Sequence, residues 1–166
     1  MSAVFTGRYT AAGQDDVTVF LIGMRLNRPW RVDRWWPVLV AMPRMIRHLA
    51  STPDAGMLGF HSWVGRTTIM LSYWRSPEHL QRFAADADAP HLAPWRRYMK
   101  VIGSSGDVGV WHETYVSHAD EREMVYANMP AFGMAVATEH VKIGPGLNTA
   151  KQRISAATPR GRGDTF

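Results

Sequence analysis

The chain has 166 residues, no cysteine and a formal net charge of +5. The absence of cysteine excludes disulfides, thiolate metal sites and a cysteine nucleophile, and it agrees with a reducing, cytoplasmic location. Residues 151–166 carry four basic side chains and one acidic one, so +3 of the charge lies in the tail, and the basic folded face of a nucleic-acid-binding module is not expected. The apolar runs are shorter than the roughly 20 residues that span a bilayer, so a membrane is not expected as a partner either.

Hydrophobic periodicity and turn residues predict alternating strands and helices. Pro37 and Pro43 should break the first helix into two pieces, because proline removes an amide and crowds the preceding turn. Ser76 is a good N-cap, and Pro77 suits the first helical position. The predicted elements are an irregular arm at 1–15, a strand at 16–27, a helix at 30–50, a hairpin at 57–66 and 67–75, helical pieces from Ser76 and at 91–102, and a strand at 108–117.

The order of these elements, β-α-β-β-α-β, is the split βαβ arrangement of ferredoxin-like domains. It predicts an α+β fold, with an antiparallel sheet and both helices on one face. The other face keeps apolar residues in either register of the last strand, so we expect a homodimer that buries sheet against sheet, a dimeric α+β barrel. The predicted parts are an N-terminal arm at 1–15, the ferredoxin-like domain at 16–118, an extension at 119–144 on the barrel or the partner subunit, and a disordered tail at 145–166.

The first candidate site lies on the second helix. The chain has no glycine-rich nucleotide motif, zinc-protease motif or serine-hydrolase elbow, so histidines in apolar surroundings are the best candidates. His91, Trp95 and Tyr98 would share one helical face. His91 could serve there as a general base or as an axial haem ligand, and the alternative is a capping or exposed residue at the helix start.

The second candidate site lies on the last strand, which carries Trp111, His112 and Glu113. Side chains alternate along a strand, so His112 and Glu113 face opposite ways and cannot form a simple dyad. If His112 faces the helices, Glu113 faces the dimer side and needs a partner such as Arg25 or an arginine of the other subunit. Structural roles for both residues are the alternative.

Three further features belong to the predicted site. Arg25 and Asn27, at the end of the first strand, are candidate polar anchors for a substrate or dioxygen. His61 and Trp63 share one face of a strand, where a histidine is more often a hydrogen-bonded filler than a catalyst. The aromatic side chains expected to line the pocket are Trp74, Trp95, Tyr98 and Trp111.

Seven segments together resemble one family: GRYTA (7–11), VFLIGMRLN (19–27), AMPRM (41–45), YWRS (73–76), HLAPWR (91–96), VGVWHETY (108–115) and YANMPAFGMA (126–135). They are similar to the monooxygenase-like branch named after an enzyme of fungal fumagillin biosynthesis. The resemblance implies a dimeric α+β barrel that oxidises a small hydrophobic, aromatic or polyketide-like molecule, as in secondary metabolism. Antibiotic-biosynthesis monooxygenases of this broader group often need neither metal nor flavin, because the substrate carbanion itself reacts with dioxygen. No cofactor is therefore expected, and His91 or His112 would be the base.

Two alternatives stay open. Haem-degrading monooxygenases share the fold, and the position that resembles their iron-ligating histidine is His91, so haem is the alternative cofactor, with oxygenase, peroxidase-like or dehydratase chemistry. The other alternative is a dimeric domain that binds a hydrophobic small molecule without turning it over.

Overall fold

The computed structural model describes residues 3–86, 96, 98, 100 and 105–157. The larger of its two sheets is antiparallel throughout and has the strand order β3-β4-β2-β5. The first and third strands in chain order therefore lie at the centre, which is the ferredoxin-like arrangement, and the predicted fold class is confirmed. Its strands are β2 (Val17–Leu26), β3 (Met57–Trp63), β4 (Thr67–Trp74) and β5 (Val108–Ser117).

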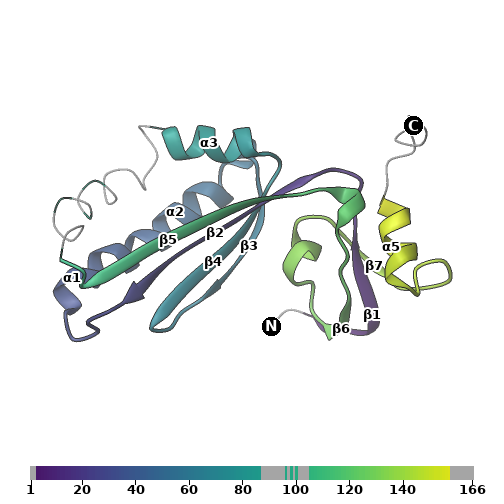
Figure 1. Cartoon of the computed structure of the whole chain (residues 1–166), viewed down its shortest axis with the longest axis horizontal. Helices are drawn as coiled ribbons and strands as arrows, with labels where there is room; N and C mark the ends of the chain where they lie inside the picture. The colour runs from purple at the N-terminus through teal and green to yellow at the C-terminus, as the bar shows by residue number, and fades with distance from the viewer. Residues whose placement is uncertain (1–2, 87–95, 97, 99, 101–104, 158–166) are drawn as a thin grey trace.

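Three described helices lie on one side of this sheet: α1 (Val32–Leu39), α2 (Ala41–Ala50) and α3 (Pro77–Ala85) (Figure 1). The predicted break of the first helix is present at Val40. Pro43 explains that position, because its ring has no N–H for the Leu39 carbonyl and crowds it. Pro37 does not interrupt the helix, contrary to the prediction, and lies inside α1. Ser76 caps α3 as predicted, accepting a hydrogen bond from the His79 amide at 3.5 Å.

The space between these helices and the sheet is filled by two apolar clusters. One joins α2 and α3 to the sheet, and its buried members are Met45, Leu49, Met70, Trp74 and Leu80. The other lies under α1 and has Met24, Tyr98 and Val108 as its buried members. The helices are held by the hydrophobic effect acting on one face of each, as the sequence periodicity predicted.

The second sheet contradicts the predicted irregular arm at 1–15. Residues Phe5–Ala12 form the strand β1, which pairs with β6 (Tyr126–Met129) on one side and β7 (Glu139–Lys142) on the other. The two sheets lie next to each other along the long axis of the molecule (Figure 1). The partners of β1 are more than a hundred residues away in the sequence, so local patterns could not reveal the pairing.

Part of the predicted disordered tail is also ordered. Residues Ala150–Ala157 form the helix α5, beside the small sheet (Figure 1). Arg153 anchors this helix, because its guanidinium pairs with Glu123 and donates a hydrogen bond to the Leu147 carbonyl at 2.7 Å. The prediction of disorder is therefore wrong for these eight residues.

The extension packs on its own subunit. It contains the 3-10 turns η2 (Ala119–Glu121) and η3 (Gly133–Val136); a third, η1 (Pro53–Ala55), precedes β3. Met134 of η3 packs with Val17 and Tyr73 on the face of the larger sheet opposite the helices, called the outer face below. Gly59 allows the close approach, since a Cβ there would lie 2.7 Å from the Val136 side chain.

We predict that Gly59→Ala loosens this contact. The added methyl group would overlap Val136, so the free energy of unfolding should fall by about 1–3 kcal/mol. Hydrogen exchange should also lose protection at the Gly133 amide, which η3 holds against the sheet. Gly65→Ala is the matched control, because a Cβ there meets nothing closer than 3.7 Å. Equal effects of the two substitutions would contradict this account of the extension.

Candidate functional site

The helix-facing side of the larger sheet carries a single ionisable group among the described strand residues. Strand alternation and the ladder register assign the side chains to this side. All are apolar or bear a hydroxyl, except His112 on β5. They are Thr18, Phe20, Ile22, Met24, Leu26, Met57, Phe60, Ser62, Thr68, Met70, Ser72, Trp74, Val108, Val110, His112, Thr114 and Val116.

His112 is accessible and lies among apolar side chains. It pairs with Ile22 in the β2–β5 ladder, and its ring centroid is 6.0 Å from that of Phe20. Val110 precedes it on the same side of the strand, and the imidazole is exposed. An exposed imidazole on an apolar surface can remove a proton from a bound hydrophobic molecule, so His112 is the candidate base that the described residues offer.

The predicted companions of His112 belong to the packed core. The Tyr98 hydroxyl donates a hydrogen bond to the Val108 carbonyl at 2.9 Å, and burial raises the pKa of this phenol. Trp74 is 1% exposed, and its indole N–H donates to Ser72 Oγ at 3.0 Å. Both side chains lie on the same side of the sheet as His112. The predicted His91 and Trp95 lie outside the described residues.

Three other predicted site residues lie elsewhere. Trp111 lies on the outer face, close over Gly23, where a Cβ would come within 2.8 Å of the indole nitrogen. Arg25 donates to Thr67 Oγ1 at 2.9 Å. Asn27 donates to the Gly106 carbonyl at 3.0 Å, which ties the end of β2 to the start of β5. The structure therefore gives Arg25 and Asn27 local tethering contacts and separates Trp111 from His112.

Glu113 takes a partner that the sequence did not indicate. It faces away from His112, as strand alternation predicts, and it accepts a hydrogen bond from the Tyr115 hydroxyl at 2.8 Å. This hydrogen bond with the carboxylate raises the pKa of Tyr115. The suggested partner Arg25 is engaged with Thr67 instead.

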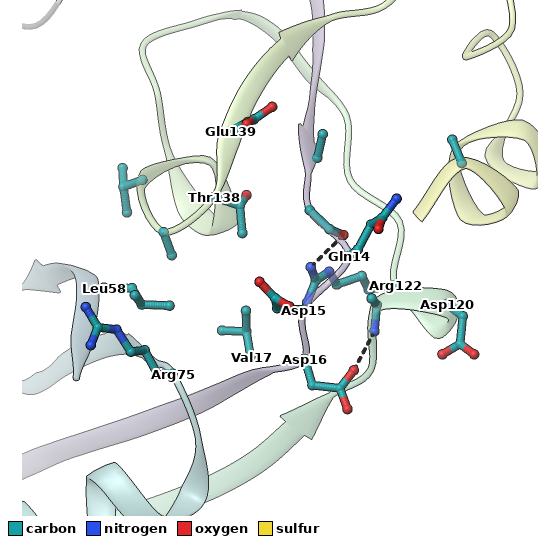
Figure 2. Close-up of a pocket in the computed structure, with 16 residues that line it drawn as sticks. Gln14, Asp15, Asp16, Val17, Leu58, Arg75, Asp120, Arg122, Thr138 and Glu139 are labelled. Carbon is teal, nitrogen blue, oxygen red and sulfur yellow. Dashed lines mark hydrogen bonds between the residues drawn. The ribbon is translucent and has the colours of Figure 1, made fainter. Parts of the chain in front are cut away.

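A hollow of about 1360 Å³ lies where the two sheets join, and sequence reasoning missed it (Figure 2). Its apolar floor includes Val17, Leu58 and Val136, and charged side chains surround the opening. Only the pairing of β1 with the extension creates this hollow, so no sequence motif could have found it.

Two charged side chains of this hollow, Arg122 and Asp16, hold neighbouring backbone segments together. Arg122 donates hydrogen bonds to the carbonyls of Gly13 at 3.2 Å and Ser117 at 3.3 Å, and burial lowers the pKa of its guanidinium (Figure 2). Asp16 accepts from the Ala119 amide at 3.0 Å and lies 2.8 Å from His118. We interpret the hollow as a structural junction between the two sheets.

His61 connects the larger sheet to the extension. Its ring packs at a tilt against that of Phe132, with centroids 4.3 Å apart, and its Nε2 accepts a hydrogen bond from the Gly133 amide at 2.9 Å. Burial lowers the pKa of His61. This is the filler role that the sequence suggested for a histidine on a half-buried strand.

We predict a pH dependence of stability from His61. The folded state holds the imidazole neutral, so the unfolded chain binds a proton first as the pH falls below its ordinary pKa of 6.5. The stabilisation is present above that value and is lost as the pH falls through the lowered pKa. His61→Gln should flatten this acid side of the curve in urea unfolding.

His118→Gln is the control, with the opposite sign. The hydrogen bond with Asp16 raises the pKa of His118, so its stabilisation is present below 6.5 and is lost as the pH rises through the raised pKa. An unchanged acid side in His61→Gln would contradict the assignment to His61.

Two features are absent from the chain outside the gaps at 87–95, 97, 99 and 101–104 and the two ends. No described helix is long and apolar enough to cross a membrane. No three His, Cys, Asp or Glu side chains of these residues gather where they could hold a metal ion.

The family model described as Monooxygenase af470-like matches residues 17–134. The chain belongs to this family. The matched range begins at the first residue of β2 and ends inside η3, so the af470-like unit comprises the larger sheet, its helices and the first part of the extension. The strands β1 and β7 and the helix α5 of this af470-like protein lie outside the match.

Comparison with solved structures adds two distant likenesses. A protein of Shewanella oneidensis is 14% identical, with a TM-score of 0.40, over 72% of this chain and 99% of that one. A Bordetella bronchiseptica protein described as an antibiotic biosynthesis monooxygenase is 17% identical, with a TM-score of 0.30, over 58% of this chain and 94% of that one. No curated protein sequence matches. The family match therefore carries the assignment of this protein as monooxygenase-like.

Proposed function

We propose that this af470-like protein is an oxidoreductase that oxygenates a hydrophobic, aromatic or polyketide-like molecule without a bound cofactor, with His112 as base. The observation that carries the proposal concerns the described strands: on their helix-facing side, His112 is the one ionisable side chain among apolar or hydroxyl-bearing ones. Phe20, 6.0 Å from His112, and Val110 supply the adjacent apolar surface. Trp74 and Tyr98 support this surface from within the core.

The chemistry requires a substrate with an acidic CH₂ group between carbonyl or aromatic groups. His112 takes one proton, and the carbanion passes electrons to dioxygen, so that a carbon–oxygen bond forms. The resulting peroxide anion takes this proton back from His112 and becomes a hydroperoxide. His112 then removes the second C–H proton as the O–O bond breaks, and it passes that proton to the departing hydroxide, so that water forms. The balance is R₂CH₂ + O₂ → R₂C=O + H₂O, in which carbon is oxidised and dioxygen is reduced. An apolar site favours this route because it keeps away water, which would otherwise return a proton to the carbanion.

We further propose a cytoplasmic homodimer that forms through the outer face of the larger sheet. Apolar side chains remain on this face beyond the part that η3 covers, including Tyr115 and Trp63, which are exposed. An uncovered face of this kind favours association with a second copy. Sedimentation velocity over a range of concentrations tests this directly, and a monomer at all concentrations would refute it.

The test of the reaction is oxygen consumption with a panel of anthrones, quinols and related polyketide-like compounds. Oxygen uptake with one product oxygen derived from ¹⁸O₂ would support the proposal. A Soret band after hemin addition that disappears in His112→Ala or His91→Ala would favour the haem alternative instead. Compounds that bind and are recovered unchanged in air would favour a binding domain.

A further inference from the structure

The outward side of α1 presents apolar side chains to solvent, which is unusual for a surface helix. Trp35, Val38 and Leu39 face the core. Next to them around the helix lie Val32, Trp36 and Val40, which are spaced by four residues and all exposed, with Trp36 at 53%. Trp30, just before the helix, is 73% exposed. Together these four residues are called the α1 stripe.

Basic side chains continue this surface into α2. Val40 has helical backbone angles (φ −75°, ψ −14°), so the outward side of α1 runs on toward Arg44 and Arg47. Both arginines are exposed, and neither has an ion-pair partner among the described residues. The one acidic residue on the stripe side, Asp33, is already paired with Arg31 and Arg34.

This region carries the net charge of the whole chain. Residues 25–50 contain six of the 19 Lys and Arg residues and one of the 14 Asp and Glu residues. The remaining residues, including the basic tail and the acidic segments, carry thirteen of each. Arg28 and Arg31 of this stretch pair with Asp107, Arg34 pairs with Asp33, and Arg25 bonds Thr67. Among the described residues, the cations beside the exposed tryptophans that are free to meet a partner are therefore Arg44 and Arg47.

We propose that the α1 stripe and the exposed arginines of α2 bind the surface of an anionic lipid bilayer. Tryptophan prefers the headgroup region, where its ring is apolar and its N–H can hydrogen-bond. Arginine is attracted to anionic headgroups, and exposed apolar side chains beside it can enter the boundary between the headgroups and the acyl chains. A second copy is a poorer occupant, since a twofold contact would place Arg44 and Arg47 against their own equivalents.

The proposal revises the expectation that no membrane partner is involved, which rested on the lack of a spanning segment. Peripheral binding needs no such segment. It uses the helices, whereas the proposed dimer uses the outer face of the sheet, so both contacts are compatible. It is also independent of His112 and of the proposed reaction, because the readout is binding to lipid alone.

Co-sedimentation of the full chain with vesicles tests this binding. Wild-type protein should pellet with vesicles of equimolar phosphatidylglycerol and phosphatidylcholine, and stay in solution with phosphatidylcholine alone. The double variants Trp30→Ala/Trp36→Ala and Arg44→Glu/Arg47→Glu should each bind at least about tenfold more weakly. Trp63→Ala is the matched control on the outer face, where that ring is 44% exposed, and it should bind as wild type.

Several results would overturn the proposal. Wild-type protein that stays in solution with both vesicles refutes it. Unchanged binding by the tryptophan pair, with loss only in the arginine pair, would reduce the contact to non-specific charge attraction. A change of oligomeric state of the tryptophan pair in sedimentation velocity, with lipid binding unchanged, would assign the stripe to a second copy. Circular dichroism of each variant establishes that the fold is retained.

Discussion

Replacement of His112 by alanine should lower kcat/KM for oxygen consumption by about 10²–10⁴, the usual contribution of a positioned general base. His112 is the described ionisable side chain on the helix-facing side of the strands, so no other described strand residue on that side can take over its proton. The imidazole is exposed and lies beside Phe20 rather than in a hydrogen-bond network, so its removal should leave the unfolding free energy within about 0.5 kcal/mol of wild type.

The neighbouring residue supplies the control. Glu113 is also exposed and follows His112 directly, but its side chain lies on the outer face, bonded to Tyr115. Glu113→Gln should therefore leave kcat/KM unchanged if the reaction occurs on the helix-facing side. Equal losses in the two variants would indicate a general disturbance of β5. Full activity in His112→Ala would remove His112 as the base and leave His91 as the remaining sequence candidate.

Local sequence patterns were sufficient for the ferredoxin-like part of the fold. Strand alternation, the Ser76 cap and the proline break between α1 and α2 are short-range features, and the structure has all of them. Such local patterns could not predict the small sheet. β1 is bordered by partners from β6 and β7, so its stability depends on contacts that no window of neighbouring residues contains.

The candidate site also has a part that the sequence predicts and a part that it does not. Alternation correctly placed His112 and Glu113 on opposite sides of β5, because that follows from strand geometry alone. The partners of polar side chains depend on which strands come together. Arg25 therefore bonds Thr67 across the β2–β4 ladder rather than Glu113, and His61 bonds Gly133 of the extension. Neither contact has a sequence signal.

For Trp74 the sequence prediction and the structure differ, and each leads to its own experiment. The sequence placed this residue in the lining of the pocket. In the structure its ring is 1% exposed, 5.5 Å from the Phe83 ring centroid, and its N–H is satisfied by Ser72. Trp74→Ala would leave a large cavity, although the Ser72 hydroxyl would keep its hydrogen bond to the Phe20 carbonyl. Urea unfolding should therefore show a loss of about 3–5 kcal/mol. Trp63→Ala should cost less, because that ring is 44% exposed and its centroid lies 6.1 Å from that of Phe132.

Trp74→Phe then separates packing from substrate contact. Phenylalanine keeps most of the apolar volume, so the loss of stability should be smaller than that of alanine. If Trp74 acts only through the core, kcat/KM of Trp74→Phe should stay near wild type at temperatures where the variant is folded. A large rise in KM without a change in kcat, in a variant that remains folded, would mean that the indole contacts the substrate. The helices would then have to open over β4 during binding, because the folded core described here leaves Trp74 no access to a ligand.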